Sequence, residues 1–213
     1  MSGGERHGRF IVLEGIDGSG TTTQSHALAR WFEDRNEQAV VTSQPSRGPL
    51  GTMLREILRG TIGSQLPSGE TEPVDPTTIA LLFAADRLQH LESLILPNLH
   101  SGVHVICDRY VLSSYAYQTV DVDMDFVREI NSRAPPPDLT LLLEVKPETA
   151  MARIDSSRSE RDRFETLDFQ RKVADNYRNR LAKFAGSPSV TIDGEMPIAE
   201  VTTAIERAVQ GIL

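Results

Sequence analysis

The sequence predicts an α/β protein in which two layers of helices enclose a five-stranded parallel sheet. Five short apolar runs alternate with longer segments that have helical periodicity. Four of these runs are apolar at nearly every position, which is typical of parallel strands covered by helices on both faces. In sheets of this kind, ligands bind at the carboxyl ends of the strands. A chain of 213 residues buries enough surface as one unit, so we expect a single domain over residues 1–213.

The expected elements follow one another along the chain. Strands are predicted at residues 10–14, 39–43, 103–108, 139–145 and 189–193, and a last amphipathic helix lies within 197–213. Segment 60–76 is rich in Pro, Gly, Ser and Glu and predicts a loop, whereas apolar residues recur at helical spacing through 77–99. Residues 153–163 are too polar for the core and predict an exposed flap, part of a lid near 153–165.

The charge composition excludes one class of partner. The chain carries 22 basic and 30 acidic side chains, a net charge of −8, whereas proteins that bind duplex DNA present a clustered basic face. We therefore expect no nucleic-acid partner. Small phosphorylated ligands stay open, because a few local groups hold them irrespective of net charge. Nineteen of the basic residues are arginines and only three are lysines.

Three features concern the compartment. The single cysteine, Cys107, cannot form an internal disulfide and, within an apolar run, is interpreted as a small buried residue. The first ten residues lack the apolar core of a signal peptide. No apolar stretch approaches the roughly 18 residues that cross a bilayer. We expect a cytosolic protein with no membrane partner.

A glycine-rich loop directly follows the first expected strand, and a helical pattern follows the loop. The loop residues are Gly15, Ile16, Asp17, Gly18, Ser19, Gly20, Thr21 and Thr22. The spacing of Gly15, Gly20 and Thr22 fits a P-loop, in which backbone N–H groups bind phosphate at a helix N-terminus and a hydroxyl binds Mg²⁺. The fold is then a three-layer α/β/α fold of the P-loop NTPase type, with Thr22 as the hydroxyl. A purely structural glycine turn is the alternative.

The loop lacks the lysine of that motif. Thr21 occupies its position, where a lysine normally bridges the β- and γ-phosphates. Either another cation replaces the lysine, or the protein binds nucleotide and is slow or inactive as a catalyst. Arginines of the flap are candidates for a closing lid: Arg153, Arg158, Arg161 and Arg163. The alternative is a solvated loop whose own carboxylates neutralise these arginines.

Polar residues also follow other expected strands. Asp108 and Arg109 end the third strand, where Arg109 would clamp a phosphate and Asp108 would hold Mg²⁺ or its water shell. An ion pair between the two, or a helix cap, is the alternative. Arg47 lies on the loop after the second strand, where glycine and proline are equally consistent with a simple turn.

Phe83 and Arg87 lie four residues apart on the expected helix and therefore share one face. Such a face would stack a planar base and hydrogen-bond its edge. Equally, Phe83 would be a core residue and Arg87 a surface charge. The five histidines form no metal-binding pattern with the cysteine, so His90 is interpreted as an ordinary helix residue.

These motifs resemble those of the thymidylate kinases, P-loop enzymes that transfer the γ-phosphate of ATP to dTMP. The similarity extends from Phe10 to Tyr177 and rests on five ordered segments: FIVLEGIDGSGTTTQ, LLFAADRLQHLESLILPNL, ICDRYVLSSYAYQ, APPPDLTLLLEV and RDRFETLDFQRKVADNY. Among nucleoside monophosphate kinases, the FAADRxxH and DRYxxSSYAYQ segments are specific to this family. The resemblance implies phosphorylation of dTMP to dTDP in dTTP synthesis, with ATP and Mg²⁺, by a homodimer.

The resemblance also implies roles for individual residues. The loop from Gly15 to Thr22 would hold the phosphates of ATP, with Asp17 near the 3′-hydroxyl and phosphate of dTMP. Asp108 and Arg109 would lie at the centre of phosphoryl transfer, with Thr22 and Asp108 at the metal. Acceptor contacts are implied for Arg47 on the phosphate, Phe83 on the thymine ring, Arg87 at its O4 edge, and Ser114, Tyr117 and Gln118 around base and sugar. Ser43-Gln44-Pro45 departs from the Arg-Glu-Pro usual before that loop.

Many bacterial members of this family carry catalytic arginines in the lid, whereas the eukaryotic type places one in the P-loop. This chain has no arginine between Gly15 and Thr23. The resemblance therefore assigns the lid arginines Arg158, Arg161 and Arg163 to catalysis, with Arg153 at the bound nucleotide. Two alternatives stay open: a nucleotide-binding regulator that lost catalysis with the lysine, or a kinase for another pyrimidine deoxynucleoside monophosphate.

Overall fold

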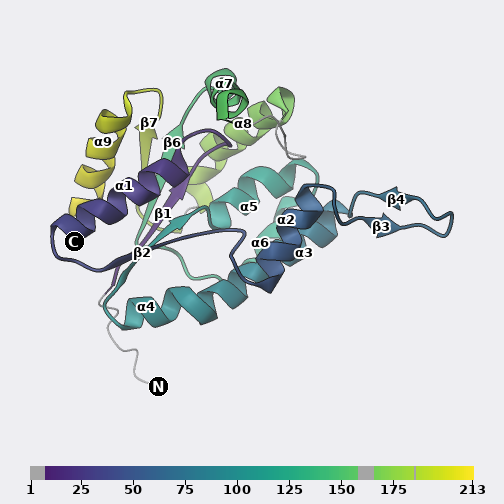
Figure 1. Cartoon of the computed structure of the whole chain (residues 1–213), viewed down its shortest axis with the longest axis horizontal. Helices are drawn as coiled ribbons and strands as arrows, with labels where there is room; N and C mark the ends of the chain where they lie inside the picture. Colours follow the sequence, from purple (N-terminus) through teal and green to yellow (C-terminus); the bar gives the residue numbers. More distant parts are fainter. Residues whose placement is uncertain (1–7, 158–165, 185) are drawn as a thin grey trace.

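A parallel sheet of five strands forms the centre of the computed structural model, which describes residues 8–157, 166–184 and 186–213 (Figure 1). The strands are β1 (Phe10–Glu14), β2 (Ala39–Ser43), β5 (His104–Asp108), β6 (Leu139–Glu144) and β7 (Ser189–Asp193). They lie in the order β2-β5-β1-β6-β7, and each neighbouring pair is parallel. The predicted fold class is confirmed, and the predicted strand bounds differ by at most one residue.

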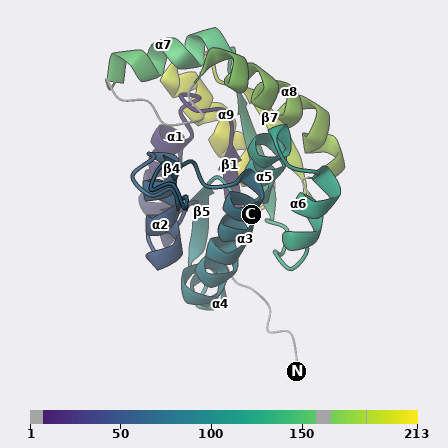
Figure 2. The same ribbon diagram turned by 90° about the vertical axis from the view of Figure 1, so that its right-hand side faces the viewer.

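Helices cover the sheet on both sides (Figures 1 and 2). They are α1 (Thr21–Asp34), α2 (Pro49–Leu58), α3 (Pro76–His90), α4 (Leu96–His100), α5 (Val111–Tyr117), α6 (Met124–Ile130), α7 (Pro147–Ser157), α8 (Leu167–Phe184) and α9 (Ile198–Gln210). Two short turns complete the set, a π-helical one at Leu91–Ile95 and a 3-10 one at Gln118–Val120. One face of the sheet packs against α1 and α9, and the other against α4, α5 and α8.

The central strand β1 shows why its sequence is apolar throughout. Ile11 and Leu13 belong to the cluster under α1 and α9. Phe10 and Val12 belong to a cluster on the other face, which includes Leu91, Ile95 and Leu99. Because consecutive strand residues point to opposite faces, a strand covered on both sides must be apolar at every position.

The predicted helix over 77–99 is interrupted by a change in its winding. The α-helix α3 ends at His90, the π-helical turn Leu91–Ile95 follows, and α4 begins at Leu96. Pro97 lacks an N–H group, and its ring displaces the carbonyl group of the residue four positions earlier. The wider turn before Pro97 accommodates both effects. Leu88, expected on the apolar face of this helix, is 39% exposed.

The prediction of an irregular loop over 60–76 is wrong in its centre. Strands β3 (Ser64–Gln65) and β4 (Thr71–Glu72) form an antiparallel hairpin that projects away from the main sheet (Figure 1). Its turn is closed by the N–H of Gly69, which donates to the carbonyl oxygen of Leu66 at 2.9 Å. A turn with Pro67 at its second position and a glycine of positive φ at its fourth is a recognised hairpin signal.

The prediction of an exposed flap is also wrong for its first residues, 153–157. Residues up to Ser157 continue helix α7, and Ile154 is buried against the glycine loop. The apolar Ile154 within the polar segment gives α7 a buried side. Positions 158–163 of the predicted flap lie outside the described residues.

Candidate active site

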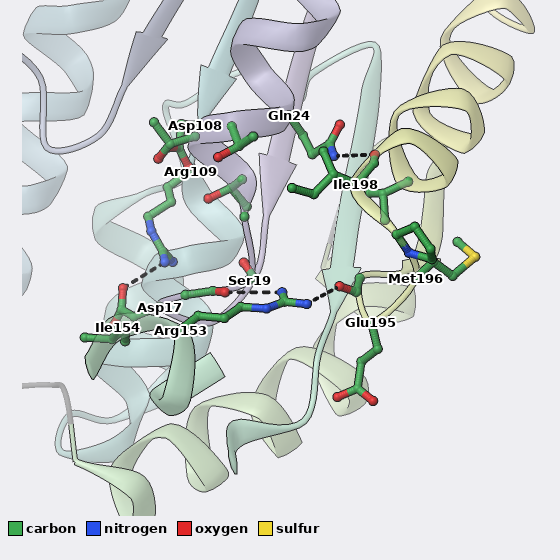
Figure 3. A pocket seen from close by; sticks show the side chains of 18 residues that line it. Asp17, Ser19, Gln24, Asp108, Arg109, Arg153, Ile154, Glu195, Met196 and Ile198 are labelled. Carbon is green, nitrogen blue, oxygen red and sulfur yellow. Dashed lines mark hydrogen bonds and ion pairs between the residues drawn. The ribbon is translucent and has the colours of Figure 1, made fainter. Parts of the chain in front are cut away.

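The glycine loop joins the carboxyl end of β1 to the N-terminus of α1, so it lies at the edge where the parallel strands end (Figure 3). Gly20 caps α1 with a left-handed backbone, φ 96°, and Gly18 has φ 79°. A Cβ atom on Gly18 would lie 2.4 Å from the carbonyl oxygen of Ala150, so the loop packs directly on α7. The first turn of α1 contains no acidic residue. Its N–H groups and the positive end of its dipole therefore favour an anion.

A cavity of about 850 Å³ opens in front of this loop. Its walls come from the loop, the end of β5, helix α7, and the turn between β7 and α9. The lining residues outside the loop and the start of α1 are Asp108, Arg109, Arg153, Ile154, Gly194, Glu195, Met196, Pro197, Ile198 and Val201. Of the predicted loop residues, Gly15 and Ile16 do not line this cavity, and Ile16 is buried in the apolar core.

Arg153 lies in this cavity wall rather than in an exposed flap. Its Nη2 donates to the carbonyl oxygen of Gly194 at 3.0 Å, and its Nη1 donates to that of Gly18 at 3.5 Å (Figure 3). The guanidinium thus bridges the glycine loop and the turn after β7. Arg153 is brought to the predicted nucleotide site, whereas Arg158, Arg161 and Arg163 lie outside the described residues.

The two predicted metal ligands lie together. The Thr22 hydroxyl donates to Oδ2 of Asp108 at 2.5 Å, and Oδ1 of Asp108 is buried with no partner among the described residues. A hydroxyl beside an under-satisfied carboxylate fits a hard cation such as Mg²⁺. Among the described residues, no group of three acidic, histidine or cysteine side chains is placed to hold a metal ion. Such a sparse set fits an ion that also takes oxygens from substrate phosphates and water.

Arg109 is paired with Asp17, not with its neighbour Asp108. Its Nη2 lies 2.9 Å from Oδ1 of Asp17, and its Nη1 donates to the carbonyl oxygen of Gly15 at 2.7 Å. The guanidinium also lies over the Tyr117 ring, 5.0 Å from the ring centroid. Burial acts to lower the pKa of Arg109, but Tyr117 and Asp17 help to outweigh it and raise that pKa well above its ordinary value. The cation at this position is therefore permanent.

Asp17 is held from a second side by Gln170 of α8. The Gln170 amide donates from Nε2 to Oδ2 of Asp17 at 2.7 Å, and its Oε1 accepts the Asp17 N–H at 3.3 Å. Both carboxylate oxygens of Asp17 therefore have a fixed partner. The side chain is oriented before any ligand binds.

Beneath this pair, the fully buried carboxylate of Glu14 connects β1 to α5 and α8. Oε1 accepts the N–H groups of Tyr110 at 2.9 Å and Ser113 at 3.2 Å. Oε2 accepts the hydroxyls of Ser113 at 2.5 Å and Tyr177 at 3.0 Å. Burial nevertheless dominates and raises the pKa of Glu14 above 4.5, although the hydrogen bond from Ser113 and the charge of Arg109 oppose it. The carboxylate fixes the start of α5 at a cost in stability.

A second cavity of about 250 Å³ adjoins the first on the other side of Arg109. The predicted residues Phe83, Arg87, Ser114, Tyr117 and Gln118 all line it, together with Asp17, Gln44, Pro45, Arg55, Leu58, Arg109, Tyr110 and Ser113. Asp17 and Arg109 line both cavities. The predicted acceptor residues are thus brought together next to the predicted phosphate loop.

Arg87 is not the surface charge that one interpretation of its helix face implied. It is 1% exposed, and burial lowers its pKa from the ordinary value. Its Nε donates to Oε1 of Gln44 at 2.9 Å, and its Nη1 donates to Oδ1 of Asn131. Its Nη2 donates to the Tyr110 carbonyl oxygen at 3.1 Å and to the Ser114 hydroxyl at 2.8 Å. The guanidinium is fixed in the wall of the second cavity.

Arg47 is not brought to either cavity; its side chain is exposed on the loop after β2. A different arginine, Arg55 of α2, lines the second cavity and donates to the carbonyl oxygens of Pro45 and Ser46 at 2.7 and 2.5 Å. Arg55 was not predicted from the sequence, because it lies inside a helix with no motif beside it. Glu14 and Gln170 were not predicted either, although both fall within the family-like segments.

The thymidylate kinase family model matches residues 13–205. The chain belongs to the thymidylate kinase family. The matched range contains every residue that lines the two cavities. Membership in the thymidylate kinase family makes the chain an enzyme of nucleotide-dependent phosphotransfer.

Individual thymidylate kinases are similar over most of their length. The chain is 47% identical to the probable thymidylate kinase of Methanocaldococcus jannaschii over 169 residues, 79% of each chain. It is 43% identical to that of Pyrococcus horikoshii over 173 residues, 80% of this chain and 81% of the relative. It is 37% identical to the thymidylate kinase of Neisseria meningitidis over 210 residues, 95% and 97% of the two chains. In the described part of this thymidylate kinase family member, no helix is long and apolar enough to cross a membrane.

The buried Glu14 carboxylate leads to a prediction about stability and activity together. Because the pKa of Glu14 is higher in the folded than in the unfolded state, its contribution to stability is complete below about pH 4.5 and is lost as the pH rises through the folded-state pKa. Glu14→Gln, which resembles the protonated form, should therefore unfold in urea no more easily than wild type at pH 7. Phosphotransfer activity should fall about tenfold, since the hydroxyl contacts of Ser113 and Tyr177 change.

Urea unfolding at pH 5 and pH 7, combined with steady-state kinetics, checks this prediction. The difference in unfolding free energy should shift in favour of Glu14→Gln as the pH rises. Glu14→Ala is the matched comparison, since it leaves the donors of Tyr110, Ser113 and Tyr177 without an acceptor and should lose about 2–4 kcal/mol. A pH-independent difference between wild type and Glu14→Gln would contradict the assignment.

Proposed function

We propose that the chain phosphorylates dTMP to dTDP, taking the γ-phosphate from ATP with Mg²⁺, as a step of dTTP synthesis. The observation that carries the proposal is that the two cavities meet at Asp17 and Arg109. The larger cavity is bounded by the glycine loop and the smaller by Phe83 and Arg87. Phosphates bound in both would approach each other at this point, as transfer between two nucleotides requires. The printed names of the relatives agree with dTMP as acceptor.

The smaller cavity supports a pyrimidine with a carbonyl group at position 4. Among the described residues, four of the five N–H groups of Arg87 have acceptors, which leaves one Nη1 N–H for a ligand. A lone donor fits the O4 of thymine and faces a like donor in the 4-amino group of cytosine. Phe83 would stack on the ring, and Ser114 and Gln118 would line the base and sugar. The Tyr117 ring would crowd the 2′ position and favour deoxyribose.

Phosphoryl transfer places few chemical demands on the protein. An oxygen of the acceptor phosphate forms a bond to the γ-phosphorus while the bond from that phosphorus to the bridging oxygen breaks, and ADP leaves with the electron pair. The attacking oxygen is already anionic, so no general base is needed. Positioning and charge neutralisation supply the rate. The N–H groups of the loop and Arg109 would hold the phosphates in line, with Asp17 near the 3′-hydroxyl.

Thr22 and Asp108 would hold Mg²⁺, which neutralises charge on the phosphate oxygens of bound ATP. Because position 21 is a threonine and not a lysine, arginines would supply the remaining positive charge opposite the phosphates. Arg153 lines the larger cavity, which is the proposed donor cavity for ATP. Arg109 lies where this cavity meets the smaller one, the proposed acceptor cavity for dTMP. We infer that residues 1–213 form one domain and that the later part of the predicted lid adds the catalytic arginines Arg158, Arg161 and Arg163 on closing. The family resemblance is what supports these three assignments.

Steady-state assays with ATP, Mg²⁺ and dTMP, dUMP or dCMP test the acceptor. The wild type should turn over with dTMP preferred. Phe83→Ala should lower kcat/KM for dTMP by about 10- to 100-fold, because the stacked ring is lost. Phe126→Ala, in α6 and outside both cavities, is the matched control. Nucleotide binding without turnover in wild type would identify a regulator instead, and preference for dCMP would identify a different kinase.

The lid proposal predicts a separation of turnover from affinity. Replacing Arg158, Arg161 and Arg163 together by alanine should lower kcat about 100-fold and change the KM for dTMP by less than about threefold, since the cations act on the transferring phosphoryl group. The matched triple variant replaces the exposed arginines Arg35, Arg128 and Arg207. Unchanged turnover in the lid variant would show that these arginines form only a solvated charged segment.

The homodimer implied by the family resemblance has a candidate surface. Leu81 and Leu88 lie seven residues apart on α3 and are 48% and 39% exposed, and Met53 of the adjacent helix α2 is 44% exposed. Leu81→Arg with Leu88→Arg should convert a dimer to a monomer in sedimentation velocity, because two charges would be buried in an apolar contact. Leu213→Arg, equally exposed at the chain end, should remain dimeric. A monomeric wild type would exclude the proposal.

A further inference from the structure

A buried polar cluster surrounds Arg87 in the wall of the second cavity, and its other members have no role in the proposed function. It consists of His90 on α3, Thr42 and Gln44 at the end of β2, and Arg87. His90, Gln44 and Arg87 are 3%, 5% and 1% exposed. Buried polar groups must satisfy one another, because no water replaces a missing partner. The state of each group in this cluster therefore constrains the next.

The Gln44 amide has a fixed orientation. Its Oε1 accepts the N–H of Arg87 Nε at 2.9 Å, and its Nε2 lies 3.4 Å from Nδ1 of His90. An amide nitrogen only donates and an amide oxygen only accepts. Since the oxygen must face the guanidinium, the NH₂ end faces His90, and Nδ1 must be an acceptor. The ring proton then lies on Nε2 and is donated to the Thr42 hydroxyl at 2.7 Å.

Asn131, the other amide on Arg87, is anchored in the same way. Its Nδ2 donates to the carbonyl oxygen of Val127 at 2.7 Å, which turns Oδ1 toward Nη1 of Arg87. Both amides are thus held at their NH₂ ends and present oxygens to the guanidinium. The anchor of Asn131 is a backbone carbonyl, which always accepts. The anchor of Gln44 is an imidazole, which accepts only in one tautomer.

The other states of His90 would misplace Gln44. A proton on Nδ1 would face the NH₂ group, and rotation of the amide would place that NH₂ against the Nε–H of Arg87. Two donors would then face each other in a buried site. Burial lowers the pKa of His90, and Arg87 does so too, whereas Asp86 opposes this shift. The neighbours from β2, Thr42 and Gln44, carry no charge.

We propose that His90 is a positioning residue for recognition of the acceptor base. Its neutral imidazole, with Nδ1 as acceptor, sets the Gln44 amide, which holds Arg87 so that the remaining N–H meets a 4-oxo group and rejects a 4-amino group. The inference rests on the proposed function, since it assumes a pyrimidine in the second cavity. The proposal gives a role to the histidine of the FAADRxxH segment, whose sequence pattern predicted an ordinary helix residue.

Two substitutions separate the two ring nitrogens of His90. In His90→Asn the amide oxygen can take the place of Nδ1 and still accept from Gln44. In His90→Gln the amide reaches toward Thr42 and leaves the place of Nδ1 without an acceptor. His90→Gln should raise the KM for dTMP and lower the preference for dTMP over dCMP about tenfold, the effect of one misplaced hydrogen bond, with kcat and the KM for ATP little changed. His90→Asn should keep that preference within about threefold of wild type.

His100→Gln, the same change at an exposed position at the end of α4, is the control. Equal effects of His90→Asn and His90→Gln on base preference, or no effect of either, would overturn the proposal. So would loss of ATP binding together with dTMP binding, because a general structural defect moves both.

The tautomer itself can be measured on the wild-type protein without catalysis. ¹⁵N NMR should show His90 neutral, protonated on Nε2 and unprotonated on Nδ1, and a proton on Nδ1 would overturn the proposal. In Gln44→Glu, Nδ1 of His90 should instead carry a proton, because a carboxylate has no hydrogen to donate to Nδ1 and favours a protonated His90. If the chain showed these NMR states but did not phosphorylate dTMP, the proposed function would be refuted. The hydrogen bonds from His90 through Gln44 to Arg87 would still stand.

Discussion

The ion pair between Arg109 and Asp17 is the contact on which the arrangement of the site depends. Leu13 of β1 and Asp108 of β5 are directly paired in the parallel sheet, so the residues that follow these strands emerge side by side. Arg109 adopts a left-handed backbone, φ 73°, which costs about 1–3 kcal/mol for a residue other than glycine. Its N–H donates to the Leu13 carbonyl oxygen at 2.8 Å, which holds that conformation. The side chain is thereby directed at Asp17 and at both cavities.

The buried carboxylate of Glu14 lies below this contact. Glu14 accepts four hydrogen bonds from Tyr110, Ser113 and Tyr177. Its raised pKa shows that these bonds do not fully offset the loss of hydration. The same four bonds join the end of β1 to α5 and α8, the helices that carry Tyr117 and Gln170 to the site. Stability is given up at Glu14 in exchange for an ordered junction between the cavities.

The parts of the fold and site that follow from the sequence are those set by local pattern. Continuous apolar runs located four of the five strands, and the glycine loop and Asp108-Arg109 were adjacent to those runs. The missed parts depend on distant partners: Gln170 reaches Asp17 across 153 residues, and Glu14 reaches Tyr177 across 163. His90 looked ordinary because its role depends on Gln44, which a motif around His90 cannot reveal. The start of the predicted flap is helical instead, because the single apolar residue Ile154 packs this polar segment against the core.

Position 21 of the glycine loop is a threonine and not a lysine, but the cavity in front of the loop contains another cation, Arg153. A lysine in the glycine loop reaches a phosphate as a single flexible charge, whereas a guanidinium can bridge several acceptors in one plane. Arg153 uses this property, since it donates to carbonyl oxygens on two different segments and still lines the donor cavity. Its charge is therefore anchored to α7, between the glycine loop and the turn after β7. Under the proposed function, the loss of the loop lysine would move charge neutralisation from a flexible side chain to a guanidinium that two segments of the fold hold in place.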